Sequence, residues 1–321
     1  MKQKIFTLLL ISAIGLVSCR KDKVEQNIKQ YDDSQIQNYI SVHGITGMLK
    51  DPTGGDTTGM YYKLILPGNT TLTPLDYPDK VSYVFTLSSL DGKYISADTI
   101  QNHEEDYLGH LVNDGLPAGL QLAIKNLLKY PGASMRLLIP SHLAYGVNGY
   151  GSGSSTIANS KIAGNQSLDY YVHTIDITTP AGYQVYDTQV ISNYFKNNNI
   201  NISDYTKTES IAYPGNFYYY KVLTKGTGVT PITDNSTVTV TYTGSLLNGT
   251  VFDGAYNGSN TTELTIADLT SGVKEALEKA AVTGTKISII VPSALAYGST
   301  TSGSIPINSC LRFTFQIVDV Q

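Results

Sequence analysis

The side chains best suited to chemistry lie near the end of this 321-residue chain, between Val240 and Gln321. Three short segments follow one another there: VTYTGSLLNGTVFD from Val240, VPSALAYG from Val291 and GSIPINSCLRFTFQIV from Gly303. Their side chains are mainly aliphatic and aromatic, and they include a single carboxylate, Asp253. Aromatic walls with few polar groups are typical of a small apolar binding pocket. No phosphate-binding glycine loop accompanies them.

A second group of reactive side chains lies in the first half of the chain. His103, Glu104, Glu105 and Asp106 are consecutive, and His110 follows closely. Their spacing matches no recognised metal-ligand motif, so a solvated acidic loop is the better interpretation. We therefore expect neither a metal site nor a cofactor.

The composition excludes some classes of function. The formal net charge is −4, charged residues make up 15% of the chain, and no run of Lys or Arg occurs. Nucleic acid is therefore not an expected partner. The many Tyr, Thr and Gly residues favour strands and turns. Cys310 lies in an apparent strand without a His close in sequence, so we expect a buried small side chain rather than a catalytic thiol.

The N-terminus has the pattern of a targeting segment. Lys2 and Lys4 precede the apolar run Ile5–Val17, which is too short to span a membrane, and Cys19 follows. The Leu-Val-Ser-Cys ending resembles the lipobox of bacterial lipoproteins. Residues 1–18 are thus predicted to be a lipoprotein signal peptide, with an ordinary secretory signal as the alternative.

Lipidation of Cys19 would anchor the mature chain to a membrane. Arg20 rather than Asp follows the cysteine, which by resemblance to known sorting favours the outer membrane of a bacterial envelope. Whether the periplasmic or the surface face is used stays open. Residues 19–33 are polar and charged, and they are predicted to be a flexible tether.

The chain contains an internal duplication. Tyr61–Lys63 recurs as Tyr219–Lys221, and PSHLAYG at Pro140–Gly146 recurs as PSALAYG at Pro292–Gly298. Each copy is long enough to bury its own core. The predicted boundaries are 34–179 for the first unit and 180–321 for the second.

Each unit is predicted to combine helices with antiparallel strands, which gives an α+β fold. A leading helix is expected at the start of each unit, with Asp32-Asp33-Ser34 able to cap the first and Asp187-Thr188 able to cap the second. Further helices are expected at Pro117–Leu128 and Thr265–Ala281, the second capped by Asp268. The expected strands are Met60–Leu66, Val81–Leu87, Leu168–Ile177, Phe217–Thr224, Thr237–Tyr242 and Leu311–Val320.

The second unit resembles an FKBP-type peptidyl-prolyl cis-trans isomerase domain over about Phe217 to Gln321. The resemblance implies a curved antiparallel sheet packed on a short helix in each unit, because the first unit repeats the second. The matching residues are Tyr242, Gly249, Phe252-Asp253, Gly284, Ala296-Tyr297-Gly298, Ile305-Pro306 and Phe313.

Members of this family catalyse cis-trans isomerisation of X–Pro peptide bonds. The rotation barrier of roughly 18–20 kcal/mol arises from amide resonance. Twisting the bond removes that resonance and lowers the charge separation, so an apolar pocket favours the twisted state. No nucleophile and no metal is needed.

The resemblance also implies roles for single residues. Aromatic walls for the proline ring would be Tyr242, Phe252 and Phe313; Tyr297 would donate a hydrogen bond to a substrate carbonyl; and Asp253 would be a buried carboxylate facing the twisting amide. The expected catalytic residues are Tyr242, Phe252, Asp253 and Tyr297, and the expected substrate-binding residues are Leu269, Thr270, Val273 (at the pocket floor), Ile305 (through its backbone N–H) and Phe313.

The two copies depart from the family pattern to different degrees. Val273 stands where the family usually has Trp, which removes apolar contact area and predicts modest activity. In the first unit Ser96 replaces the carboxylate, unless nearby Asp98 takes its place. Efficient catalysis is therefore not expected there. The other first-unit counterparts of site residues are Phe85, Ile95, Leu120, Tyr145, Ile162 and Tyr170.

Two functions remain for the whole chain. The first is a lipid-anchored folding factor of the bacterial envelope, an enzyme that isomerises X–Pro bonds of polypeptides in its second unit. The second is a non-catalytic lipoprotein that uses two FKBP-like folds to bind peptides or proteins. The sequence leaves the oligomeric state open.

Overall fold

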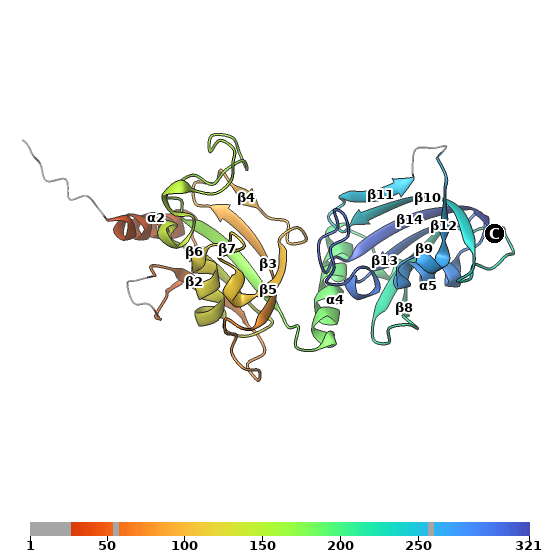
Figure 1. Cartoon of the computed structure of the whole chain (residues 1–321), viewed down its shortest axis with the longest axis horizontal. Helices are drawn as coiled ribbons and strands as arrows, with labels where there is room; N and C mark the ends of the chain where they lie inside the picture. The colour runs from red at the N-terminus through yellow and green to blue at the C-terminus, as the bar shows by residue number, and fades with distance from the viewer. Residues whose placement is uncertain (1–26, 54–57, 256–259) are drawn as a thin grey trace, which may run out of the picture.

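The computed structural model describes residues 27–53, 58–255 and 260–321. Within these ranges the chain forms two antiparallel sheets of seven strands, each with its own hydrophobic core (Figure 1). The α+β fold class is confirmed. The predicted signal peptide and the lipidation site Cys19 lie outside the described residues.

The sheet of the first unit is crossed by one short helical segment on one face. Every pair of neighbouring strands in it is antiparallel. Across the sheet the strands are β1 (Leu49–Lys50), β2 (Tyr61–Pro67), β6 (Ala133–Ile139), β7 (Leu168–Ile175), β3 (Lys80–Ser89) and β4 (Ile95–Ser96), and β5 (His103–Tyr107) also pairs with β3.

The second sheet repeats the first strand for strand. The order across it is the same, and the seventh strand again pairs with the partner of the short edge strand. The duplication seen in the sequence is therefore a duplication of topology. The strands are β8 (Thr206–Glu209), β9 (Phe217–Thr224), β13 (Lys286–Val291), β14 (Leu311–Val320), β10 (Thr237–Leu246) and β11 (Val251–Ala255), with β12 (Thr262–Thr265) paired to β10.

Helices occupy equivalent places in the two units. A leading helix precedes each sheet, and a shorter one packs against each core. The helices are α2 (Ile28–Val42), α3 (Ala118–Ala123) with the π-helical turn η2 (Ile124–Leu128), α4 (Pro180–Asn197) and α5 (Ser271–Ala280); the 3-10 turns are η1 (Leu108–His110), η3 (Ser141–Leu143), η4 (Gly146–Asn148), η5 (Ile202–Asp204), η6 (Ile266–Asp268) and η7 (Ser293–Leu295).

The leading helices begin earlier than the sequence suggested. The Asn27 side chain caps α2 by accepting a 3.0 Å hydrogen bond from the Gln30 N–H, and Pro180 occupies the first turn of α4. Residues 28–33 of the expected tether are therefore helical. Asp32 and Asp187 are not caps; both lie inside their helices, buried.

Each buried carboxylate holds its helix to the unit that follows. Asp187 Oδ2 accepts hydrogen bonds from the Ser293 N–H (2.8 Å) and hydroxyl (2.7 Å), at the start of η7. Asp32 Oδ2 lies 2.9 Å from His142 Nδ1 and accepts from the His142 N–H at 3.3 Å. A carboxylate removed from water needs such donors, so each Asp makes a tertiary contact and not a helix cap.

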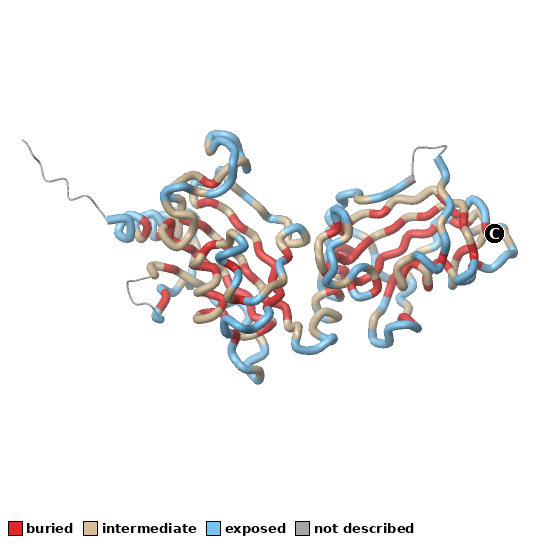
Figure 2. Tube along the Cα trace, in the orientation of Figure 1, coloured by how far each residue is buried: buried red, intermediate tan, exposed pale blue. Residues whose placement is uncertain are grey.

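Two central strands, β6 and β13, were not among the strands expected from period-2 alternation, and the burial of β13 shows why. Five consecutive residues of β13, Ile287 to Val291, are buried. Ile289 faces the core under α5, whereas Ile290 packs in the cluster that contains Ile191 of α4. A strand covered on both faces is apolar throughout and carries no period-2 signal. Figure 2 shows these buried strands at the centre of each sheet.

Helix α4 lies between the two units (Figure 1). Its Tyr186 ring makes edge contacts with His103 and His173 of the first unit, at 5.6 and 6.4 Å between ring centroids. Glu105 accepts hydrogen bonds from Tyr183 of α4 and from Asn308 of the second unit. In the described part of the chain, no helix is long and apolar enough to cross a membrane.

The Asp187 contact predicts a pH dependence of stability. Burial raises the pKa of Asp187 to about 6 from its ordinary 3.8, and the Ser293 hydrogen bonds only partly oppose this. Between these values the native state binds more protons than the unfolded state, so stability falls as pH rises. From pH 4.5 to 7.5 the wild type should lose about 2 kcal/mol relative to Asp187→Asn, measured by urea unfolding.

The matched control is Asp319→Asn, which removes an exposed carboxylate of the same unit. Its unfolding free energy should follow that of the wild type across the same pH range. Identical pH profiles for Asp187→Asn and the wild type would contradict the assignment.

Candidate functional site

Aromatic rings from three neighbouring strands meet in the second unit. Phe252 of β11 contacts Phe313 of β14 edge to face, with ring centroids 5.8 Å apart and planes at 81°. Phe315, which the sequence analysis did not single out, stacks on both Tyr242 (5.5 Å) and Phe313 (5.9 Å). Its place two residues after Phe313 on the same face of β14 was the available signal. The three predicted wall residues thus lie in one aromatic cluster.

Gly244 makes room for this cluster. It lies on β10 between Asp253 of β11 and Phe313 of β14. A Cβ at this position would lie 2.7 Å from the Phe252 ring and 3.0 Å from the Phe313 ring. The absence of a side chain therefore lets both rings pack down onto the sheet.

The carboxylate of Asp253 is held by its neighbours but is not buried. Its Oδ2 accepts a 2.5 Å hydrogen bond from the Tyr242 hydroxyl, and its Oδ1 accepts one from the Gly254 N–H at 2.8 Å. Burial, and then the Asp253 carboxylate, raise the pKa of Tyr242. The expectation of a buried Asp253 is wrong: the residue is exposed, because β11 is an edge strand paired on one side only.

Tyr297 stands beside this pair on a tightly bonded loop. It follows η7 and is 40% exposed, and its charge when ionised would raise the pKa of Tyr242. The loop is fixed by the Gly298 N–H, which donates to the Ser293 carbonyl at 2.9 Å. Gly298 has φ +58°, a conformation that favours glycine.

The start of α5 borders the same core. Val273 is buried and belongs to the cluster that contains Phe313 and Ile305, and Leu269 packs on it partly buried. Thr270, not Asp268, is the residue before the first helical turn; Asp268 lies exposed in η6. The Thr270 hydroxyl is buried and has no hydrogen-bond partner among the described residues.

Ile305 differs from the expectation. Its backbone N–H donates to the Ser302 carbonyl at 2.9 Å, so it is not free to bind a substrate carbonyl. The reason is local: Ser302 and Ile305 form a reciprocal bridge across a tight turn. The Ile305 side chain is buried in the core.

The first-unit counterparts also gather in one place. Phe85, Ser96, Tyr145 and Tyr170 line a pocket of about 210 Å³. Asp98 does not supply the lost carboxylate: its Oδ2 accepts a hydrogen bond from Asn248 of the second unit. Leu120 and Ile162 are buried in the adjoining core, whereas Ile95 is exposed.

The acidic segment after Gln101 is a strand rather than a solvated loop. Because it is β5, its side chains alternate: Glu104 and Asp106 line the first-unit pocket, and His103 and Glu105 face the other way. His103 Nε2 lies 2.9 Å from the Ser82 hydroxyl. Across the described residues, no group of three or more side chains is placed to hold a metal ion.

Comparison with known proteins identifies the family of the second unit. Residues 228–318 match the family model of the FKBP-type peptidyl-prolyl cis-trans isomerases. That range contains every predicted site residue of the second unit, from Tyr242 to Phe313. Residues 228–318 of the second unit thus match an FKBP-type domain in sequence.

Two curated relatives and one solved structure are each similar to part of this chain. An FkpA isomerase of Buchnera aphidicola is 40% identical over 89 residues, which is 28% of this chain and 35% of that protein. An outer membrane protein MIP of Legionella longbeachae is 35% identical over 103 residues, 32% of this chain and 43% of that protein. The chain therefore spans less than half the length of either relative. The crystal structure of Escherichia coli FkpA has 26% identity and a TM-score of 0.36, covering 44% of this chain and 60% of that one.

The packing over Gly244 predicts the effect of a small substitution. Gly244→Ala should lower the free energy of unfolding by about 1–3 kcal/mol, because the new methyl group overlaps the Phe252 and Phe313 rings. Urea unfolding measures this loss. Thr243→Ala, at the neighbouring half-buried position of β10, serves as the control and should cost less. A fully tolerated Gly244→Ala would show that the rings do not pack as described.

Proposed function

We propose that the second unit catalyses cis-trans isomerisation of X–Pro bonds in polypeptides. The observation that carries the proposal is the aromatic cluster of Tyr242, Phe252 and Phe313 with the Asp253 carboxylate hydrogen bonded beside it. The match of residues 228–318 to the isomerase family supports it. Because the relatives are matched over less than half of their length, the activity of the whole chain is part of this proposal.

The arrangement suits rotation of an amide without covalent chemistry. A proline ring would pack against Phe252 and Phe313. Burial of its apolar surface would contribute roughly 25 cal/mol of favourable binding free energy per Å². The planar amide is more polar than the twisted one, so loss of water raises the energy of the planar state more. Each lowering of the barrier by about 1.4 kcal/mol gives a tenfold faster rotation.

Polar groups at the rim would orient the peptide. The exposed Tyr297 hydroxyl would donate a hydrogen bond to a substrate carbonyl. The Ile305 N–H would not do so, because it already donates to the Ser302 carbonyl. Thr270 lies behind this rim at the start of α5, where its buried hydroxyl has no hydrogen-bond partner among the described residues. Leu269 and Val273 complete the apolar lining. The small Val273 side chain limits the contact area and predicts a modest rate.

The test is a cis-trans assay of the full chain on a proline-containing peptide. Asp253→Leu and Tyr297→Phe should each reduce kcat/KM at least about tenfold, a loss of about 1.4 kcal/mol or more. Tyr213→Phe, which changes an exposed tyrosine of the β8–β9 loop, should leave the rate unchanged. If the wild-type chain did not accelerate isomerisation of the peptide, the proposal of isomerase activity would be wrong.

The same assay separates the units. Asp253→Leu should remove nearly all activity of the full chain, because the first unit has Ser96 in place of the carboxylate. If half of the activity survived, the first unit would be an active isomerase. The alternative function, a non-catalytic peptide-binding lipoprotein, is favoured by that altered first unit and by Val273. It predicts peptide binding by the second unit with no rate enhancement.

We further propose that the chain is a folding factor anchored by lipid on Cys19 in the bacterial outer membrane. The lipobox-like ending supports this, and one relative is named an outer membrane protein. Cys19→Ala should move the protein from the membrane fraction to the soluble fraction after cell lysis. Retention of the variant in membranes would instead indicate an uncleaved N-terminal anchor.

A further inference from the structure

The pocket of the first unit has aromatic walls. It has a volume of about 210 Å³, which suits one long side chain rather than a drug-sized ligand. Tyr145 and Tyr150 stack at 4.5 Å on one side, and Phe85 lies 5.6 Å from Tyr170 on another. Tyr83 and Tyr94 complete the aromatic lining.

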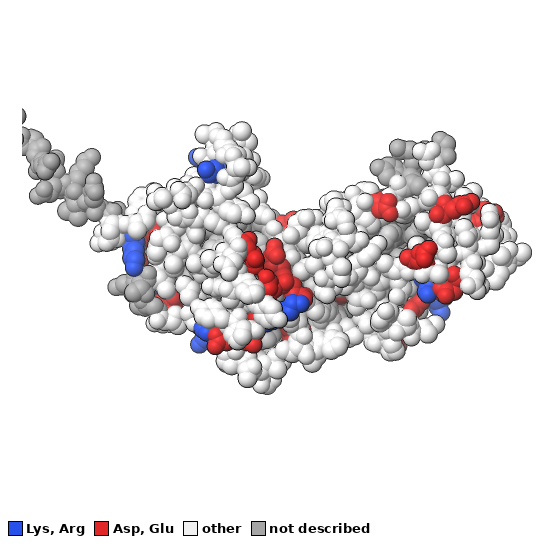
Figure 3. Space-filling view, in the orientation of Figure 1, with Lys and Arg blue, Asp and Glu red and all other residues white. Residues whose placement is uncertain are grey.

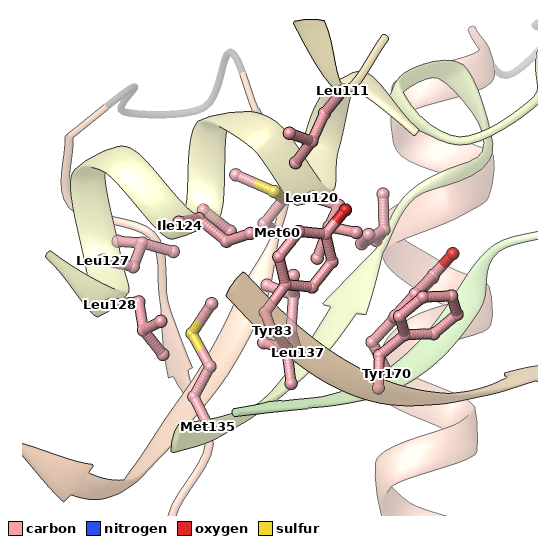
Figure 4. Packing of buried hydrophobic residues seen from close by; sticks show 14 of the residues in the cluster. Met60, Tyr83, Leu111, Leu120, Ile124, Leu127, Leu128, Met135, Leu137 and Tyr170 are labelled. Carbon is pink, nitrogen blue, oxygen red and sulfur yellow. The ribbon is translucent and has the colours of Figure 1, made fainter. Parts of the chain in front are cut away.

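One wall carries a buried hydroxyl that is only weakly bonded by the protein. Tyr170 occupies the place of Phe313 in the second unit, and it is fully buried. Its hydroxyl has no partner within normal hydrogen-bond geometry among the described residues. Burial, followed by the charge and a weak hydrogen bond of the Tyr145 hydroxyl, raises the pKa of Tyr170. The same hydrogen bond partly opposes the rise that burial causes in the pKa of Tyr145. In Figure 4 the Tyr83 and Tyr170 rings rise from the sheet with their hydroxyls on the same side. A buried hydroxyl without a well-formed hydrogen bond costs free energy, and a ligand that supplies one removes this cost.

The rim of the first-unit pocket carries acidic side chains on β5, and the equivalent positions of β12 in the second unit are neutral. Glu104 and Asp106 pair with Tyr83 and Val81 across β3 and β5. The second-unit residues at the matching registers are Thr262 and Leu264. Asp114 adds a third carboxylate to the rim. Figure 3 shows acidic side chains gathered over β5 on the first unit.

These carboxylates have little counter-charge. The one ion pair to them within the described ranges joins His110 to Asp106, at 3.4 Å between Nδ1 and Oδ1, and is largely exposed. Lys80 pairs with Glu105, which faces the second unit instead. Partial burial raises the pKa of Glu104, and the neighbouring Asp114 and Asp106 raise it further. A bound cation would relieve this repulsion.

We propose that the first-unit pocket binds a basic side chain, arginine or lysine, of a polypeptide. Aromatic faces attract a cation, and arginine in particular stacks on them. The rim carboxylates accept its N–H groups, and the Tyr170 hydroxyl oxygen accepts one more hydrogen bond. The first unit is then a docking site for basic segments, distinct from the isomerase site of the second unit and independent of its activity.

The proposal is tested on the full chain with fluorescent five-residue peptides that contain no proline. One peptide has a central arginine among alanines, and its control has neutral citrulline there. The arginine peptide should bind with a dissociation constant at least tenfold lower, read by fluorescence anisotropy. Equal affinities would overturn the proposal.

Variants locate the site. Glu104→Gln combined with Asp106→Asn should weaken binding at least fivefold, and Tyr170→Phe should weaken it about threefold. Glu263→Gln, an exposed carboxylate on the matching strand β12 of the second unit, should have no effect. Unchanged binding in both pocket variants, or loss of binding in Glu263→Gln, would overturn the assignment. Asp114→Asn changes only an exposed rim residue and gives the same test if the double variant does not fold.

Competition with free arginine amide separates a polypeptide ligand from a small amine. The peptide should bind more tightly, because its backbone adds contacts at the rim. If free arginine amide binds as tightly as the peptide, the ligand is a small amine and the polypeptide part of the proposal fails. The isomerase assay is unaffected by these variants, so failure here is distinguishable from failure of the proposed catalytic function.

Discussion

A buried carboxylate in each leading helix is the contact on which the arrangement of the chain depends. Asp187 is removed from water and is satisfied by Ser293, at the first residue of the loop that carries Tyr297. The same contact fixes α4 against the second sheet, which leaves Tyr183 and Tyr186 turned toward the first unit. A single unpaired charge at this position would be costly, so the helix, the loop and the neighbouring unit are placed together.

The duplicated frame tolerates divergence where packing does not require identity. Gly119 and Gly272 stand at equivalent points of the two core helices, and a Cβ there would lie 2.5 Å from Ile139 and 2.7 Å from Val291, respectively. Both copies therefore keep the glycine that lets the helix approach the sheet. The pocket walls, which packing constrains less, have changed.

Those changes suit the first-unit pocket and the aromatic site of the second unit to different ligands. The second unit keeps one carboxylate at an edge strand beside aromatic rings, and Thr262 and Leu264 leave the opposite wall neutral. The first unit lacks that carboxylate but gains Glu104 and Asp106 on β5. One topology thus presents an apolar site for a proline ring and an acidic aromatic site for a cation, as proposed above.

The grouping of Tyr242, Phe252 and Phe313 was implied by the resemblance of the second unit to a known family. The sequence by itself determined the repeat, the α+β class and the strands with period-2 alternation. These follow from local patterns and from motif order, which need no knowledge of distant contacts. Tertiary structure alone decided the role of Asp187, since nothing local distinguishes a helix cap from a buried anchor whose partner is 106 residues away. It also decided the buried strand β13, the exposure of Asp253 at a sheet edge and the engagement of the Ile305 N–H. Each of these depends on what lies on the other side of a strand or turn, which the order of residues does not reveal.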